Sequence, residues 1–448
     1  MTPNLLDAGL LDAGLVGAAL SAARPTSYGR LVELKGLHLL AAGVDAAVGD
    51  LVEVEGVDHH GHRGAVVPAE VIASSAAGTV CLPLGSTHGL RVGSRVRPTG
   101  GPLRVPVGDE LRGRVLDGLG RPIDGGPSLA HLPTVSVENE TPNALLRGRV
   151  DQQVGLGVRA LDALVPCGRG QRMGIMAGSG VGKSTLLSMI ARGTEAQVSV
   201  IALVGERGRE VREFLENDLG PEGLARSVVV IATSDAPAVE RLRAAFVATR
   251  IAEHFRDGGQ DVLLMMDSLT RVAMAQREIG LSAGEPPATR GYPPSVFGIM
   301  PRLLERAGPG ETGSITGLYT VLVEGDDLQD PIGDTARSIL DGHIVLSRKL
   351  ATSGHFPSID VLESISRVVP AITTPAQRED ATALRRMLAA HREVKDIVEI
   401  GAYVPGTAPD ADRAIALMPS IDGFLRQAVD EPTASAGTWN ALAALVGR

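Results

Sequence analysis

The chain has 448 residues, of which 44% are hydrophobic and 21% charged, so we expect a globular protein of two to four domains. Its formal net charge of −9 argues against a dedicated nucleic-acid binder, which would carry a basic face. We find no secretory signal, no CxxC pair between Cys81 and Cys167, and no apolar run of the ~18 residues that a membrane helix needs, which favours a cytoplasmic protein with at most a peripheral membrane contact.

The N-terminal segment, residues 1–25, is rich in leucine and alanine and repeats the sequence LLDAG. Its leucines form no clean apolar stripe, so a frayed terminus and a partner-binding helix both remain open. In residues 26–98, short β-type runs alternate with glycine turns, for example GRLVEL, GDLVEVEG and GTVCLPLG. This spacing predicts a small antiparallel β-barrel.

Residues 99–368 begin with a turn-rich connector, GRVLDGLGRPIDGGP, and then change character. Apolar strand candidates alternate there with helical stretches; the strands are RMGIMAG, VSVIALVGE, SVVVIATS and DVLLMMDS. This alternation predicts an α/β domain with a parallel sheet covered by helices on both faces. Residues 369–448 predict a C-terminal helical domain, since ATALRRMLAAHREVKDIVEIGAY and the segment after it have helical patterns.

A P-loop is predicted where AGSGVGKST spans Ala177 to Thr185, between a strand candidate and a helix candidate. Glycines there allow backbone N–H groups to approach phosphate oxygens, and the helix N-terminus adds its positive dipole end. We expect Lys183 to neutralise the β- and γ-phosphates of ATP and Ser184 to ligate Mg²⁺. The expected nucleotide-binding residues of the loop are Gly178, Ser179, Gly180, Val181, Gly182, Lys183, Ser184 and Thr185.

Two carboxylates follow apolar strand candidates. Asp267 ends DVLLMMD, where a side chain faces the ligand crevice of a parallel sheet, and it is the predicted second magnesium ligand. The alternative role for Asp267 is to cap the next helix. Glu206 follows VSVIALV and is a candidate for activating the attacking water, with a first-turn helix glutamate as the alternative.

The order of these motifs carries a family resemblance. The P-loop is followed by GERGRE at Gly205–Glu210, MMDSLTR at Met265–Arg271 and GEPPATRGYPPSVF at Gly284–Phe297. This order resembles the catalytic subunits of rotary ATP synthases and, more closely, the ATPases that energise type III protein export. LVPCGRGQRMGIMAGSGVGKSTLL, EGDDLQDP, ILDGHIVLSR and PSIDVLESISR point to the flagellum-specific branch, with the injectisome ATPases as near neighbours.

The resemblance implies an ATP hydrolase built from a barrel, a RecA-like nucleotide domain and a helical domain. It also implies a homohexamer that binds ATP between neighbouring subunits. By motif position, Glu206 matches the catalytic carboxylate, Arg207 the basic residue beside it, and Arg367 an arginine finger directed at a neighbour's γ-phosphate. Phe356 matches the aromatic residue that stacks on adenine; the segment after Phe424–Gln427 offers no second aromatic residue.

Partners are implied in the same way. The acidic stretch Glu324–Asp330 matches a loop that lines the central hole, where relatives contact a coiled-coil stalk protein; a solvated turn is the alternative. The N-terminal segment matches, by location, a helix that docks a dimeric negative regulator, or stator. Export substrates, their chaperones and a peripheral contact with the inner face of the cytoplasmic membrane complete the expected set.

Two functions of other classes were weighed against these motifs. A non-catalytic subunit of a rotary ATPase is disfavoured by Glu206, which such subunits generally lack. A hexameric RNA or DNA translocase is disfavoured by the acidic balance and by the few aromatic residues available for base stacking.

Overall fold

The computed structural model describes residues 27–57, 63–323 and 330–448, and the chain divides into the units Met1–Pro102 and Leu103–Arg448. The predicted N-terminal partner segment and most of the acidic stretch Glu324–Asp330 therefore lie outside the described residues. No helix within the described ranges is long and apolar enough to cross a membrane.

The first unit contains a closed barrel, as the alternating sequence pattern predicted. Its strands are β1 (Gly29–Lys35), β2 (His38–Ala42), β3 (Asp50–Val57), β4 (Arg63–Ser75), β5 (Gly78–Pro83) and β6 (Arg95–Pro102), hydrogen-bonded in the order β1-β2-β5-β4-β3-β6. Alternate residues point inward, so that Leu39, Val52 and Val96 are fully buried in the barrel core. The last strand ends at Pro102, a little beyond residue 98, where the glycine-turn pattern of the sequence ended.

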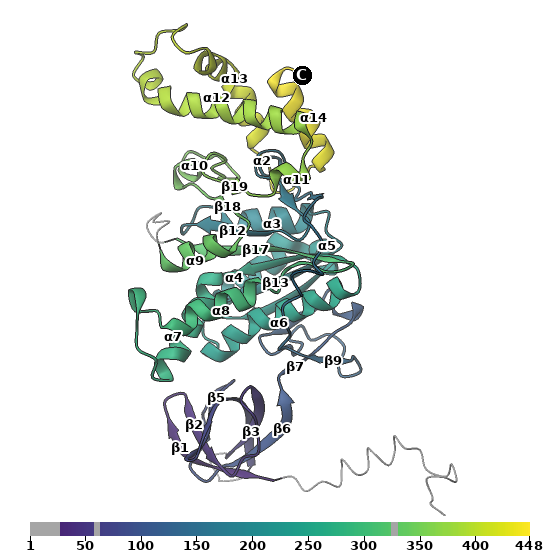
Figure 1. Ribbon diagram of the computed structural model, residues 1–448, viewed down its shortest axis with the longest axis vertical. Helices are drawn as coiled ribbons and strands as arrows, with labels where there is room; N and C mark the ends of the chain where they lie inside the picture. The colour runs from purple at the N-terminus through teal and green to yellow at the C-terminus, as the bar shows by residue number, and fades with distance from the viewer. Residues whose placement is uncertain (1–26, 58–62, 324–329) are drawn as a thin grey trace, which may run out of the picture. The chain divides into compact units, whose positions relative to one another are not determined.

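The second unit is built on a nine-stranded sheet, which Figure 1 shows between two layers of helices. Its strands are β8 (Val115–Asp117), β12 (Arg172–Ala177), β13 (Val198–Val204), β14 (Ser227–Ala232), β15 (Asp261–Asp267), β16 (Gly308–Pro309), β17 (Ser314–Leu322), β18 (Gly342–Val345) and β19 (Ile365–Ser366). The main order is β19-β18-β12-β17-β15-β13-β14-β8, and all but β16 and β19 run parallel. Burial on both faces explains why β13 is apolar along almost its whole length, and the predicted α/β class is confirmed.

Helices follow the strands on both faces of this sheet (Figure 1). One layer contains α3 (Lys183–Gly193), α4 (Gly208–Glu213), a π-helical segment (Phe214–Leu219) and α5 (Gly220–Ala225). The other contains α6 (Ala238–Asp257), α7 (Leu269–Ser282), α8 (Pro294–Leu304) and α9 (Pro331–Ile339). Smaller elements are α2 (Arg159–Leu164), α10 (Arg348–Thr352), α11 (Val369–Ile372), the pairs β7 (Arg104–Pro106) with β9 (Thr134–Ser136) and β10 (Gln153–Val154) with β11 (Cys167–Gly168), and 3₁₀ turns at Asp109–Leu111 and Thr289–Gly291.

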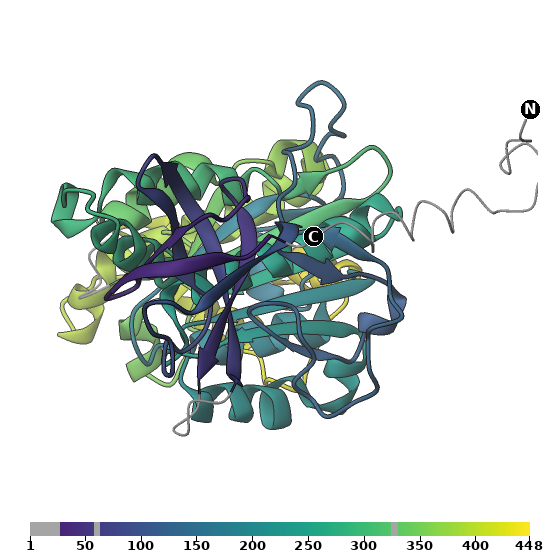
Figure 2. The ribbon, with the colours of Figure 1, turned by 90° about the horizontal axis from the view of Figure 1, so that it is seen from below.

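The connector differs from its prediction, because Val115–Asp117 within it forms β8 and pairs with β14 at the edge of the sheet. Three residues are too few to show a strand period in the sequence. Figure 2 gives a second view of this sheet.

The C-terminal part is helical, as predicted, with α12 (Pro375–Glu399), α13 (Pro409–Leu425) and α14 (Ser435–Val446). A capping box begins α12: the Thr374 side chain accepts from the Gln377 backbone, and the Gln377 side chain accepts from the Thr374 backbone. These helices contact α2 through apolar side chains, including Leu442 and Trp439. They therefore share a continuous core with the nine-stranded sheet.

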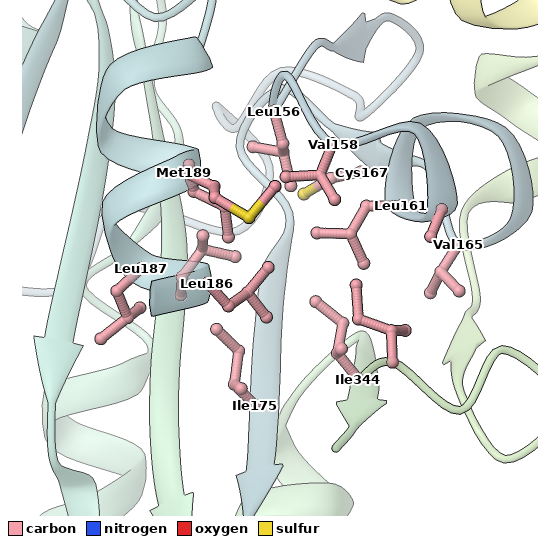
Figure 3. Close-up of a cluster of buried hydrophobic side chains, with 14 of the residues drawn as sticks. Leu156, Val158, Leu161, Val165, Cys167, Ile175, Leu186, Leu187, Met189 and Ile344 are labelled. Carbon is pink, nitrogen blue, oxygen red and sulfur yellow. The ribbon is translucent and has the colours of Figure 1, made fainter. Parts of the chain in front are cut away.

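That core surrounds the helix that follows the glycine-rich loop. Figure 3 shows Leu186 and Met189 of α3 beside Ile175 of β12, with Leu161 and Val165 at the other side of the cluster. The apolar face of α3 thus fixes the helix, and with it the loop, against the middle of the sheet.

We expect Leu161→Ala to lower the free energy of unfolding by about 2–5 kcal/mol, because the fully buried side chain leaves a cavity. Denaturant unfolding followed by the fluorescence of Trp439, the single tryptophan and a member of the same cluster, measures this loss. Leu145→Ala is the control, since Leu145 is 93% exposed and should change stability by less than about 0.5 kcal/mol. Equal shifts for the two variants would contradict this account of the core.

Candidate active site

The predicted P-loop connects the C-terminal end of β12 to the first turn of α3. Gly180 and Gly182 have φ values of 75° and 89°, in the left-handed region that glycine adopts without a steric penalty. The loop is held from its flank, because Arg348 donates from Nη1 to the Ser179 carbonyl at 3.1 Å and the Ser358 hydroxyl donates to the Val181 carbonyl. With two carbonyls occupied on that flank and α3 presenting its N-terminus, the loop is suited to an anion.

Three charged side chains meet beside this loop. The Lys183 ammonium group donates to both carboxylate oxygens of Asp267, and its Nζ lies 3.5 Å from Glu206 Oε1. These residues follow or end β12, β15 and β13, strands of one parallel sheet, so their side chains emerge at the same edge. The structure thus brings together the lysine and both carboxylates that the sequence analysis selected.

Asp267 is held in a defined orientation. Its side chain is only 6% exposed, and its Oδ1 accepts a hydrogen bond from Thr320 Oγ1 on β17 at 2.7 Å. Ser184 is exposed in the first turn of α3. One carboxylate, one hydroxyl group and phosphate oxygens form the oxygen-rich, partly open ligand set that Mg²⁺ favours, so the residues present fit this ion.

Glu206 lies in a partly dry and crowded electrostatic environment. Burial raises the pKa of its carboxyl group, the Lys183 ammonium opposes that shift, and the charge of Asp267 and a hydrogen bond with Glu210 reinforce it. A carboxylate with a raised pKa is a better proton acceptor than an ordinary one, which suits a group that activates water.

Two arginines follow the ends of the same strands. Arg207 is 76% exposed, and its Nη1 lies 3.4 Å from Oε1 of Glu210, the residue that also hydrogen-bonds to Glu206. Arg271, in the first turn of α7, packs against Gly205; its buried Nε has no hydrogen-bond partner in the described ranges. Arg271 was not selected from the sequence, although it ends the motif MMDSLTR.

Phe356 lies against the loop. A Cβ atom placed on Gly182 would be 3.3 Å from Phe356 Cε1, and the ring is 42% exposed, which leaves apolar surface for a planar group. Gln427, after α13, donates from its backbone N–H to the Phe356 carbonyl at 3.1 Å and from its side chain to the Gly157 carbonyl. The C-terminal helices therefore help to place this ring.

Arg367 lies at the opposite end of the sheet from the P-loop. It follows β19, where Ser366 pairs with Gly342, and its N–H donates to the Asp341 carbonyl at 3.0 Å. Asp341 is level with Arg172 at the start of β12, about 17 Å along the strand from Ala177 at about 3.3 Å per residue. Arg367 is exposed, and this separation is longer than an arginine side chain.

The comparisons with known proteins agree with this geometry. Residues 157–366 match the family model "ATP synthase alpha/beta family, nucleotide-binding domain", and residues 373–444 match "T3SS EscN ATPase C-terminal domain". The flagellum-specific ATP synthase of Bacillus subtilis is 51% identical over 94% of this chain and 95% of its own. The chain belongs to the ATP synthase alpha/beta family, among the type III export ATPases.

Two injectisome ATPases are also similar to this chain, one in sequence and one in structure. A type 3 secretion system ATPase of Xanthomonas euvesicatoria is 51% identical over 92% of each chain. The assembled ATPase EscN of enteropathogenic E. coli superposes with a TM-score of 0.87 at 45% identity, covering 94% of this chain and all of that one, and it has also been solved in complex with its central stalk EscO. As a member of this family, the chain is an ATPase.

The export ATPase also contains site residues that no local pattern of the sequence revealed. Arg348 and Ser358 hold the P-loop from sequence positions far beyond it, and Thr320 orients Asp267 from a neighbouring strand. These contacts depend on which segments the folded chain brings beside the loop, and no short pattern in the sequence encodes them.

We expect Glu206→Gln to retain ATP binding and to lower kcat by about 10²–10⁴-fold, because an amide of the same size cannot accept a proton from water. Steady-state hydrolysis and fluorescent-nucleotide titration measure the two effects. Glu213→Gln serves as the matched control, since Glu213 is an exposed carboxylate on α4 that pairs with Arg209. Near-normal turnover by the Glu206 variant would remove this residue from the chemical step.

We expect Phe356→Ala to weaken ATP binding by about 1–3 kcal/mol, the value of stacking one base on an aromatic ring, with little change in kcat. Phe356→Tyr retains a stacking face and should bind ATP almost as well as the unaltered protein. The measurement compares adenine nucleotides with inorganic tripolyphosphate, which has no base. Equal weakening for both ligands would contradict a stacking role.

Proposed function

We propose that this ATPase energises flagellar type III protein export, hydrolysing Mg-ATP at the subunit interfaces of a homohexamer. The observation that supports this best is the division of the site: the P-loop, Asp267 and Glu206 lie together, whereas Arg367 lies at the far end of the sheet on its exposed edge. A residue so placed is available to a neighbouring subunit and not to its own P-loop.

The proposed roles follow from this arrangement. Lys183 and the loop N–H groups hold the β- and γ-phosphates, and Ser184 and Asp267 hold Mg²⁺, which neutralises charge that develops on the phosphates. Glu206 orients and deprotonates the attacking water. Arg207, released from Glu210, adds positive charge beside Glu206, and Arg367 of a neighbouring subunit stabilises the transition state.

The flagellar assignment is supported by the Bacillus subtilis relative, which matches almost the full length of both chains. A secretion-system ATPase matches at the same identity, so an injectisome role is the second candidate. Expressing the chain in a strain that lacks its own flagellar ATPase tests the choice. Restored export of filament protein supports the flagellar role, whereas rescue of effector secretion alone, in a matching secretion mutant, supports the second.

The proposed partners follow the family resemblance. By analogy with EscN, which has been solved with its central stalk, we expect a coiled-coil stalk protein at the acidic stretch Glu324–Asp330. We expect a stator dimer at the N-terminal segment, export substrates with their chaperones, and a peripheral contact at the inner face of the cytoplasmic membrane. The formal net charge of −9 disfavours nucleic acid as a partner.

We expect Arg367→Ala to bind ATP and to lose about 10³–10⁵-fold in kcat, which corresponds to roughly 4–7 kcal/mol of transition-state stabilisation. Mixing this protein with Lys183→Ala tests whether the arginine acts between subunits. In mixed rings, some interfaces join the intact P-loop of the first variant to the intact Arg367 of the second, so the mixture should hydrolyse ATP although neither variant does alone.

Subunit exchange is confirmed separately by fluorescence transfer between labelled chains. Arg337→Ala is the control for the surface around Arg367, because Arg337 offers only its backbone carbonyl to Arg367 and should retain activity. Absence of recovery in exchanged rings would remove the arginine finger between subunits from the proposed function.

A further inference from the structure

One guanidinium group from the C-terminal helices is bonded directly to the segment that leads to Arg367. Arg385, near the middle of α12, donates from Nη2 to the Ser364 carbonyl at 2.8 Å and to the Val361 carbonyl. Its Nη1 donates to the Leu164 carbonyl, at the end of α2, at 3.0 Å. One side chain therefore joins α12, α2 and the 361–364 turn.

That turn is rigidly connected to Arg367. The Ser364 hydroxyl donates to the Asp360 carbonyl at 2.7 Å and accepts from the Val345 N–H of β18 at 2.9 Å. The next two residues form β19, whose pairing with β18 ends at Ser366, and Arg367 follows immediately. The Ser364 backbone is therefore connected to Arg367 through β19, with only two residues between them.

A second arginine on the same face of α12 contacts the same turn. Arg392, two helical turns after Arg385, pairs with Asp360 at 2.7 Å and with Glu363 at 2.9 Å. The pair with Glu363 joins two exposed side chains and contributes little by itself, whereas the Asp360 side chain is only 16% exposed. Together with Arg385, these ion pairs show that α12 contacts residues 360–364 at two positions that are two helical turns apart.

Packing between α12 and β19 is otherwise incomplete. A surface pocket of about 270 Å³ opens there, lined in part by Ile365, Ser366, Ala381, Arg385 and Trp439. Because side chains do not fill this space, a shift of α12 is not passed to β19 by van der Waals contact there. Arg385 links α12 to the turn before Arg367 from one side of this pocket, and Arg378 links α12 to the Pro370 and Thr373 carbonyls after Arg367 from the other.

Arg385 is partly buried, so its loss would leave three carbonyl groups without this hydrogen-bond donor. Burial lowers the pKa of its guanidinium group, and the charge of Asp360 offsets part of that shift. A guanidinium group has five donors in a fixed planar arrangement, and here it serves three carbonyl groups at once. Lysine carries one ammonium group and cannot reproduce that geometry.

We propose that Arg385 is a positioning residue that connects α12 to the segment before Arg367. The C-terminal helices would then determine the position of the Arg367 side chain that each subunit presents to the active site of its neighbour. This inference rests on the proposed function, in which Arg367 acts between subunits. It adds that ATP hydrolysis in one subunit depends on the helical domain of the next.

The test uses the assembled full-length protein with Arg385→Gln. We expect kcat to fall by about 10²-fold, the effect of misplacing a catalytic group by about 1 Å, with the KM for ATP little changed because the P-loop of the variant is intact. Arg385→Lys should recover part of the loss. Arg386→Gln is the matched control, since Arg386 is the next residue, 72% exposed, and should retain full activity.

Mixed rings distinguish positioning from a general structural role. Arg385→Gln mixed with Lys183→Ala should recover activity, because the second variant supplies an intact Arg367 to the intact P-loop of the first. Arg385→Gln mixed with Arg367→Ala should recover none, because neither supplies a working finger. The opposite pattern, or recovery in neither mixture, would overturn the inference, as would full activity of Arg385→Gln alone.

The mixture of Lys183→Ala with Arg367→Ala separates this inference from the proposed function. If that mixture recovers activity and the Arg385 mixtures do not follow the expected pattern, only the positioning role fails. If that mixture fails to recover, the finger between subunits fails and the role of Arg385 falls with it. Far-UV circular dichroism and size-exclusion chromatography establish that each variant is folded and assembled, and Arg385→Lys replaces Arg385→Gln if the latter is not.

Discussion

The ion cluster of Lys183 with Asp267 and Glu206 is the constraint on which the rest of the structure depends. One ammonium group between two largely buried carboxylates leaves the cluster one negative charge in excess, in a region where burial makes unbalanced charge costly. That excess favours a divalent cation beside Asp267, and under the proposed function Mg²⁺ would arrive there together with the phosphates that Lys183 would contact.

Everything around the cluster fixes its geometry. The parallel sheet brings three strand ends to one edge, the apolar face of α3 anchors the loop, and Thr320 fixes the rotamer of Asp267. The C-terminal helices reach the site along two paths, through Gln427 to Phe356 and through Arg385 to the segment before Arg367. Under the proposed function, the first path would act on the subunit's own site and the second on the site of a neighbour.

The parts of this structure that could be predicted from the sequence are those encoded by short contiguous patterns. The P-loop, Asp267 and Glu206 each follow a long apolar run, and strand ends of that kind meet at one edge of a parallel sheet. The barrel and the α/β class follow from periodicity in the same way. The roles of Arg207, Arg367 and Phe356 came from the family resemblance and remain to be tested.

What the sequence did not predict depends on tertiary contacts. Arg385 and Arg348 are two of 39 arginines, and only the folded chain shows which carbonyl groups they meet. The strand β8 was missed because three residues carry no period.

That short strand has a practical consequence for work on isolated fragments. By pairing with β14, Val115–Asp117 covers the outer edge of a strand that is buried at every position. A fragment trimmed to the family-matched region, residues 157–366, lacks β8 and exposes the N–H and C=O groups of Ser227–Ala232 on an apolar, uncharged strand. Such an edge pairs readily with a second copy of itself, so aggregation of a minimal nucleotide-binding fragment would reflect a missing three-residue cover and not a failure of the domain to fold.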